Sequence, residues 1–181
     1  MTGNISIVIG SWGSYNECNE RALGSKWLNL SDYSDWEEIV EELEAEGFEL
    51  DGIDEELFIQ DIEGIDGGGT DWDNVHPKEL FEMLQESGIL DDDDLYELFE
   101  AYVEINGYSD WERRVNSDGS SWADDIILYR NQDLDDLAYD LMHEQYEIPD
   151  YLENYIDYKS FARDLSYDGY YETSKGVLTI G

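Results

Sequence analysis

The most abundant candidate functional groups in this sequence are the carboxylates of Asp and Glu. Its 181 residues include 47 Asp and Glu against nine Lys and Arg, which gives a formal net charge of −38. Grouped carboxylates can bind calcium, and two of them can serve as the acid and base of a hydrolase. A dense array of carboxylates can also present an anionic surface to a basic partner. The spacing of the acids decides among these three chemistries.

The closest approach to a calcium loop is residues 71–82, DWDNVHPKELFE. Ligand positions 1, 3 and 12 of an EF-hand frame carry acids there, but Val75 stands at the fifth position. His76 occupies the sixth, where the turn requires Gly. This argues against a specific calcium loop. Asp91–Asp94 could attract divalent cations loosely, although capping of a helix N-terminus is the simpler interpretation.

Signatures of catalysis are not recognisable elsewhere in the sequence. His76 and His143 lie far from each other and from Cys18 in the chain, and neither has metal-ligand spacing. P-loop, nucleophile-elbow and dinucleotide fingerprints are missing. Gly67–Gly69 has no adjoining Lys and indicates a hinge, and no pair of carboxylates stands out as a glycosidase pair. We therefore expect no enzymatic activity, no cofactor and no metal.

The composition also predicts where the protein resides. Cys18 is the single cysteine, so an intrachain disulfide is impossible. The N-terminus MTGNISIVIG has no basic leader, and no apolar run reaches the length of a membrane span. An anionic chain would be repelled by anionic membranes and by nucleic acid. We expect a cytoplasmic protein that contacts neither directly.

Apolar residues recur with the periods of strands and helices, which predicts an α+β fold despite the high charge. Strands are expected at residues 5–12 and 57–62, a further one near Leu28 and Leu30, and a closing hairpin that turns at residues 174–176. Residues 125–130 fit either a strand or a helix end. Helices are expected from a Ser34/Glu37 capping box to Gly47, from Pro77 to Gly88, from Asp91–Asp94 to Gly107, and over residues 133–146 and 158–165.

The length suits one compact unit or two or three small subdomains. The order of the expected elements indicates an N-terminal α+β part over residues 1–68, a helical middle part over residues 69–107 and a C-terminal α+β part over residues 108–181. The glycine run 67–69 is the candidate linker between the first two.

The charge is concentrated in the middle of the chain. Residues 32–112 contain thirty acids and a single base, Lys78. A folded monomer of this mass exposes about 9,000 Å², so its mean charge density falls within about twofold of that of B-DNA. Self-repulsion on this scale indicates an electrostatic role for the surface.

Four segments, in order along the chain, resemble the ArdA antirestriction family. The segments are SIVIGSWGSYNE followed by GSKWLNLSDYSDWEEI, LFIQDIEGI, WADDIILYRNQDLDDLAYDLMHEQ, and LENYIDYKSFARDL, the last being the most specific. The resemblance spans nearly the whole chain and is weaker between residues 66 and 120.

The resemblance implies a DNA mimic from a mobile genetic element. Such proteins are elongated homodimers of three small subdomains, which implies a dimer interface in the C-terminal subdomain, residues 108–181. Their acids copy the phosphates of bent B-DNA. They occupy the DNA-binding groove of the methyltransferase core of type I restriction-modification enzymes. Two chains would carry the charge of ~130 Å of duplex. An acidic adaptor that binds and sequesters a basic nucleic-acid-binding protein is the alternative, and a cation-buffering protein is a third possibility.

The acids that we assign to the mimic surface fall into three groups, and neutralising any one of them should have little effect. Aromatic residues between Tyr151 and Phe161 are expected in the core or the dimer interface. The assigned acids are Glu38, Glu41, Glu42, Asp54, Glu55 and Glu56 in the first subdomain, Asp91, Asp92, Asp93, Asp94 and Glu97 in the second, and Asp124, Asp125, Asp135, Asp136 and Asp140 in the third.

Overall fold

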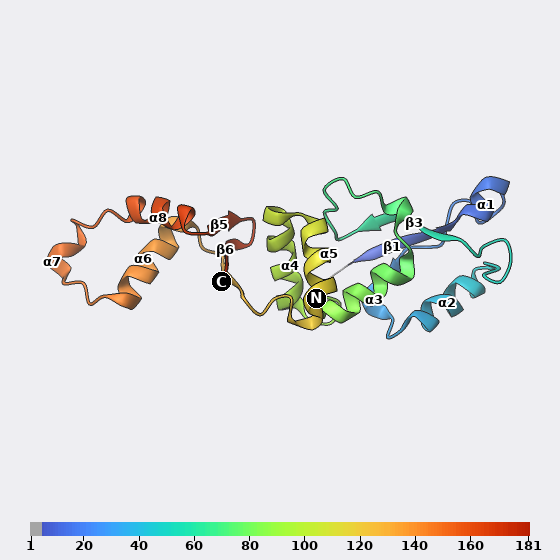
Figure 1. Ribbon diagram of the computed structural model, residues 1–181, viewed down its shortest axis with the longest axis horizontal. Coiled ribbons are helices and arrows are strands. Elements are labelled where there is room, and N and C mark those ends of the chain that lie inside the picture. Colours follow the sequence, from blue (N-terminus) through green and yellow to red (C-terminus); the bar gives the residue numbers. More distant parts are fainter. Residues whose placement is uncertain (1–4) are drawn as a thin grey trace.

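The computed structural model describes residues 5–181 and has a mixed α+β fold, which confirms the predicted class. The elements follow one another along one long axis, from α1 and α2 at one end to α7 at the other (Figure 1). The exposed surface is 10373 Å². A compact monomer of this mass would expose about 9,000 Å², so the larger value agrees with an elongated shape.

Two three-stranded antiparallel sheets and eight α-helices make up the described part of the chain. In order, the elements are β1 (Ser6–Ser11), α1 (Trp12–Glu17), β2 (Leu28–Asn29), α2 (Trp36–Ala45), β3 (Leu57–Glu63), α3 (Pro77–Ser87), α4 (Asp93–Asn106), α5 (Tyr108–Asp118), β4 (Ile126–Arg130), α6 (Leu134–Gln145), α7 (Asp150–Glu153), α8 (Tyr158–Tyr167), β5 (Tyr170–Thr173) and β6 (Gly176–Ile180), with short 3-10 helices at Leu30–Asp32, Trp72–Asn74 and Gly119–Ser121.

The first sheet has the strand order β2-β1-β3. Its central strand β1 is buried from Ile7 onward, which explains the unbroken apolar run in the sequence. The edge strand β3 alternates between half-buried and exposed positions over its second half. α2 turns Trp36, Ile39 and Leu43 inward, as its apolar spacing predicted.

The predicted capping box of α2 is wrong by one residue. Asp35 is the N-cap, and its side chain accepts a hydrogen bond from Glu38 N at 3.0 Å. Glu38 in turn accepts from Ser34 N at 2.7 Å. Capping at Asp35 makes Trp36 the first helical residue, and Trp36 is buried.

The second sheet has the order β4-β6-β5, so the segment left open as a strand or a helix end is strand β4. The predicted closing hairpin is confirmed as β5–β6, with Thr173 opposite Gly176. Gly176 has φ +141°, and a Cβ there would lie 2.1 Å from the carbonyl oxygen of Tyr129. Only glycine allows this close approach between β6 and β4.

The buried apolar residues form two clusters of unequal size. The larger contains the first sheet and α2–α5, together with Ile126 and Leu178 of the second sheet; we call residues 5–125 the body. The smaller joins α6 and α8 to Val177, and we call residues 126–181 the C-terminal region. Trp111 and Val115, beyond the predicted boundary at 107, belong to the larger cluster. The division into three subdomains stays a prediction.

Candidate acidic interaction surface

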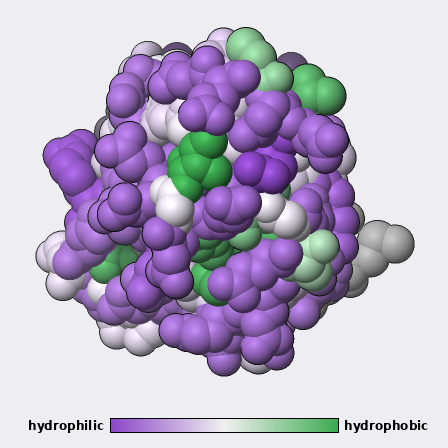
Figure 2. Space-filling model, turned by 90° about the vertical axis from the view of Figure 1, so that its right-hand side faces the viewer, coloured by the Kyte–Doolittle hydropathy of each residue, from purple (hydrophilic) through white to green (hydrophobic). Residues whose placement is uncertain are grey.

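α2 carries a band of acids at the end of the body. Glu38 and Glu41 are exposed, as are Glu37 and Glu44, on the side of the helix opposite its buried residues. Glu42 is half-buried and forms an ion pair with Lys26, so it is partly neutralised. Figure 2 views this end of the molecule, which is hydrophilic over most of its area with small hydrophobic patches. The end face can therefore meet a basic partner through several unpaired carboxylates.

The assignment of Asp54 to the surface is wrong. Its side chain is fully buried and accepts hydrogen bonds from Ser14 Oγ, from Glu49 N at 2.8 Å and from Arg21 Nε at 2.9 Å. Ser14 and Arg21 lie 40 and 33 residues away in sequence, so Asp54 joins the segment around α1 to the loop before β3. A buried carboxylate needs such partners. Asp54 therefore has a structural role and does not present its charge to a binding partner.

Opposing effects set the pKa of Asp54. Burial raises the pKa, but the hydrogen bonds from Ser14, from Glu49 N and from Ser11 lower it, as does the charge of Arg21. The lowering effects win, so the pKa lies below the ordinary value for aspartate. Asp54 is therefore charged at neutral pH and stabilises the fold.

Glu55 and Glu56 follow Asp54 and are exposed, as predicted. They line a depression with Trp12, whose ring stacks on Phe58 with a centroid distance of 4.1 Å. Asp73 lies on the same depression, which has a volume of about 480 Å³. Its aromatic wall and acidic rim would suit the stem and charge of a basic side chain.

In the middle of the chain Asp91–Asp94 are all exposed. Asp92 caps α4 by accepting from Asp94 N at 2.8 Å and from Leu95 N at 3.1 Å, which matches the capping interpretation. Asp94 forms an ion pair with Arg130 Nη2 at 2.9 Å, and the half-buried Glu97 pairs with Arg130 Nε. Two of the five acids assigned here thus face a base of the same chain.

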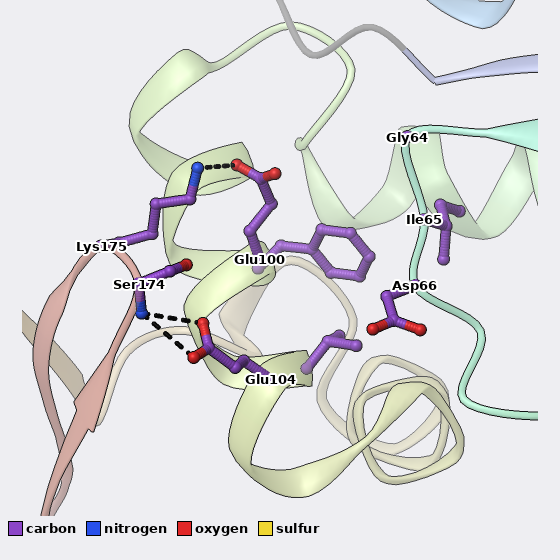
Figure 3. Close-up of a pocket in the computed structure, with 9 residues that line it drawn as sticks. Gly64, Ile65, Asp66, Glu100, Glu104, Ser174 and Lys175 are labelled. Carbon is purple, nitrogen blue, oxygen red and sulfur yellow. Dashed lines mark hydrogen bonds and ion pairs between the residues drawn. The ribbon is translucent and has the colours of Figure 1, made fainter.

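A cavity of about 510 Å³ is lined by α4, the turn of the β5–β6 hairpin and the loop after β3 (Figure 3). On one side of it Lys175 Nζ lies 2.9 Å from Glu100 Oε2, and Ser174 N donates to both carboxylate oxygens of Glu104, at 3.1 and 2.9 Å. The hydrogen bond with Glu100 is the largest of the effects that raise the pKa of Lys175. Asp66, from the loop after β3, lines the opposite side.

The acids assigned to the last third are all exposed. Asp125 pairs with Arg114, and Asp140 accepts from Gln132 Nε2 at 2.6 Å. Asp124 lies beside Asp125, and Asp135 and Asp136 occupy the first turn of α6. Of the sixteen assigned acids, thirteen are exposed, Glu42 and Glu97 are half-buried, and Asp54 is buried.

The sequence interpretation missed a second band of acids. Glu79, Glu82 and Glu86 are exposed along α3, and with Glu112 of α5 they line a groove between the two helices. Spacings of three and four residues placed these acids on one side of the helix, opposite Leu80 and Leu84. That periodicity could have identified them from sequence.

Basic side chains add little positive surface. In residues 5–181, eight of the nine Lys and Arg lie in ion pairs with carboxylates of the chain; Lys159 is the other. Each ion pair offsets the charge of one base, so acids dominate the charge of the surface. No cluster of three His, Cys, Asp or Glu suited to a metal occurs in that range.

His143 joins the ends of the segment between α6 and α8. Its Nδ1 lies 2.8 Å from the carbonyl oxygen of Tyr139 and its Nε2 lies 3.2 Å from Glu153 Oε2. Both contacts are hydrogen bonds when the ring is protonated, and they raise its pKa, the Tyr139 carbonyl most and then Glu153. Tyr158 donates to the other oxygen of Glu153 at 2.7 Å and lowers the pKa of that carboxyl. These contacts hold the loop between α6 and α8 in place.

Exposed aromatic residues gather in the C-terminal region. Tyr151, Tyr155 and Tyr167 are 74–84% exposed, whereas Phe161 packs against the smaller cluster. Part of the predicted aromatic segment is therefore core and part is surface. Exposed tyrosines in such number are typical of an interface between proteins.

Comparison with known proteins comes from a family model. The antirestriction protein (ArdA) family model matches residues 7–179, nearly the whole chain. No curated protein matches the sequence. The chain belongs to the ArdA antirestriction family. Within residues 5–181, no helix is both long and apolar enough to cross a bilayer.

Proposed function

We propose that this member of the antirestriction family is a DNA mimic that competes with DNA for the binding groove of type I restriction-modification enzymes. The observation that carries the proposal is the exposure of thirteen assigned acids along an elongated chain of net charge −38. Spread over 10373 Å² of surface, this charge amounts to one unit per about 270 Å². Concentration on one face would bring the density close to that of a duplex.

The mechanism is electrostatic exchange. Lys and Arg of a DNA-binding groove meet phosphates and release condensed counterions; carboxylates of the mimic would replace those phosphates. Phosphate contacts position a duplex without reading its sequence. One mimic could therefore inhibit enzymes that recognise different sequences.

Many weak contacts carry the affinity in this account. Glu37, Glu38, Glu41 and Glu44 on α2 and the α3 band are unpaired candidates, with Glu82 as the exception because it contacts Lys78 at 3.6 Å. Exposed ion pairs contribute about 0.2–1 kcal/mol each. Energy spread in this way distinguishes a mimic from an enzyme, in which one carboxylate would be indispensable.

We further propose that the protein acts as a homodimer in the cytoplasm. Exposed Tyr151, Tyr155 and Tyr167 support an interface in the C-terminal region. A dimer joined there would double the length of the acidic surface. Sedimentation of the purified protein tests this part, and Tyr155→Ser should shift it toward the monomer.

The experiment that tests the function is displacement of DNA from a type I methyltransferase core. Purified protein should displace duplexes of unrelated sequence at near-stoichiometric amounts, from cores of different specificity. An acidic adaptor would leave DNA on the core and would instead bind basic nucleic-acid-binding proteins. Persistence of the core–DNA complex at a tenfold excess of the protein would falsify the proposal.

A further inference from the structure

Four carboxylates line the side of α4 that faces the second sheet. Asp94, Glu97, Glu100 and Glu104 are separated by three, three and four residues, which keeps them on one side of the helix. The polar groups that meet them, shown in part in Figure 3, come from β4 and from the turn of the β5–β6 hairpin: Arg130, Lys175 and the amide of Ser174. The contact between α4 and the second sheet therefore includes a row of charged side chains.

Strand alternation accounts for the position of Arg130. Leu128 and Ile126, two and four residues before Arg130 on β4, pack against the core of the body, and Tyr129 packs on the other side with α6 and α8. Residues two apart on a strand point to the same face. Arg130 therefore continues the face that meets α4.

Arg130 and Lys175 are also coupled to each other. Asn131 N donates to the carbonyl oxygen of Lys175 at 2.9 Å, and Arg130 is the strand partner of Gly176. The close approach of Gly176 to the backbone of Tyr129 packs the end of the turn against β4. Both bases therefore move with the sheet as one unit.

We infer that Arg130 and Lys175 are positioning residues that fix the C-terminal region against α4 and thereby set the spacing between the acids of the body and those of α6. This inference rests on the proposed function for its effect on inhibition. Its structural part, the attachment of the hairpin turn to α4, stands on the contacts alone. Removing the two bases should make the spacing between the acids of the body and those of α6 less well defined, although it makes the protein more negative.

The expected effect of removing Arg130 and Lys175 is opposite to the one that charge complementarity predicts. Arg130→Gln with Lys175→Gln removes two positive charges, which by attraction alone would tighten binding to a basic groove. If the spacing changes, the competent arrangement is populated less and the apparent affinity falls in proportion. We expect inhibition to weaken by about threefold to tenfold, since the ion pairs to α4 are few and partly exposed.

A matched control removes the same charge elsewhere. Lys78 pairs with Glu82 within α3, and Arg163 contacts Asp164, its neighbour on α8; neither pair bridges the body and the C-terminal region. Lys78→Gln with Arg163→Gln should leave inhibition unchanged or slightly stronger. Arg130→Lys with Lys175→Arg keeps both charges and should retain most of the inhibition.

Amide hydrogen exchange supplies a structural readout that does not depend on the target enzyme. The Ser174 amide should exchange about tenfold faster in the Arg130/Lys175 variant, because its contact with Glu104 is loosened. The Leu137 amide, which donates to Asp133 O at 3.0 Å within α6, should be unchanged and so reports that the region is folded.

The outcomes separate the two proposals. Weaker inhibition and faster Ser174 exchange, with the control pair unaffected, support the positioning role. Equal or stronger inhibition in both double variants, or an unchanged Ser174 amide, overturns it. If the unmodified protein fails to displace DNA, the proposed function fails, and exchange at Ser174 still decides whether these bases attach the hairpin.

Discussion

The body and the C-terminal region both carry exposed acids, but their interiors are very different. The body buries aromatic residues around Trp111, which contacts Phe99, Tyr108 and Trp122. In the C-terminal region five residues make up the buried cluster, and tyrosines are left exposed. A large apolar core can offset the repulsion among surface acids. The C-terminal region has a smaller core and depends also on Ile126 and Leu178, which pack into the larger cluster, on polar contacts to α4 and, in our proposal, on a second chain.

Truncating a side chain at the centre of each cluster should show the largest difference in stability between the two interiors. Trp111 is fully buried in the body, so Trp111→Ala should lower the free energy of unfolding by about 3–5 kcal/mol. Leu137, at 1% exposure in the smaller cluster, should cost only about 2 kcal/mol when changed to Ala. Urea denaturation followed by circular dichroism measures both. Equal losses in the two variants would mean that the interiors do not differ as described.

The buried Asp54 network gives the next largest effect. Asp54→Ala leaves the amide of Glu49 and the side chains of Ser14 and Arg21 without their acceptor, which should cost about 2–3 kcal/mol of unfolding free energy. The exposed neighbour Glu55→Ala is the matched control and should change stability by less than about 0.5 kcal/mol.

Acid titration tests the same network. The pKa of Asp54 in the folded state is lower than in the unfolded chain. Its stabilising contribution is therefore complete above the unfolded value and disappears as the pH falls through the folded one. The stability of the Asp54→Ala variant should depend less on pH in this acidic range than that of the unmodified protein. Parallel stability curves would contradict the assignment.

In the C-terminal region the contact between His143 and Glu153 responds to pH at higher values than Asp54 does. The pKa of His143 is raised, so its contribution to stability is present below the unfolded value and lost as the pH rises through the folded one. Glu153→Gln should lower the pKa of His143 and speed amide exchange in residues 146–157. NMR titration measures the pKa, and Glu17→Gln, in the body, should leave it unchanged.

Single neutralisations on the surface should have the smallest effects. Glu41→Gln should weaken binding to a type I methyltransferase core by less than about threefold, because one exposed contact contributes little. Joint replacement of Glu37, Glu38, Glu41 and Glu44 should weaken it by about tenfold or more. Fluorescence competition with labelled DNA measures both. Loss of inhibition on a single change would point instead to an active site.

Sequence periodicity predicted the longer elements well, because their apolar residues face one core. α3 begins at Pro77 and ends before Gly88, and α6 occupies the expected stretch. α1 was missed because six residues hold too little periodicity, and α5 because its polar residues outnumber its buried ones. Trp111 and Val115 are core residues because they pack against α4 and α3, and these tertiary contacts are not apparent from local sequence.

The candidate surface was predictable as a region and less so residue by residue. Asp54, Glu55 and Glu56 look alike in sequence, and nothing local indicates that Asp54 turns inward toward Ser14 and Arg21. The pairing of Arg130 with α4 likewise joins residues more than thirty apart. Such contacts depend on tertiary structure, which local patterns do not encode.

The central claim is that carboxylates of this chain replace DNA phosphates, and the salt dependence of its binding to a type I methyltransferase core tests that most directly. We expect the logarithm of the binding constant to fall linearly and steeply with the logarithm of salt concentration, as it does for DNA on the same core. Tight binding that is insensitive to salt would mean that apolar contacts hold the complex, and the mimicry account would be wrong.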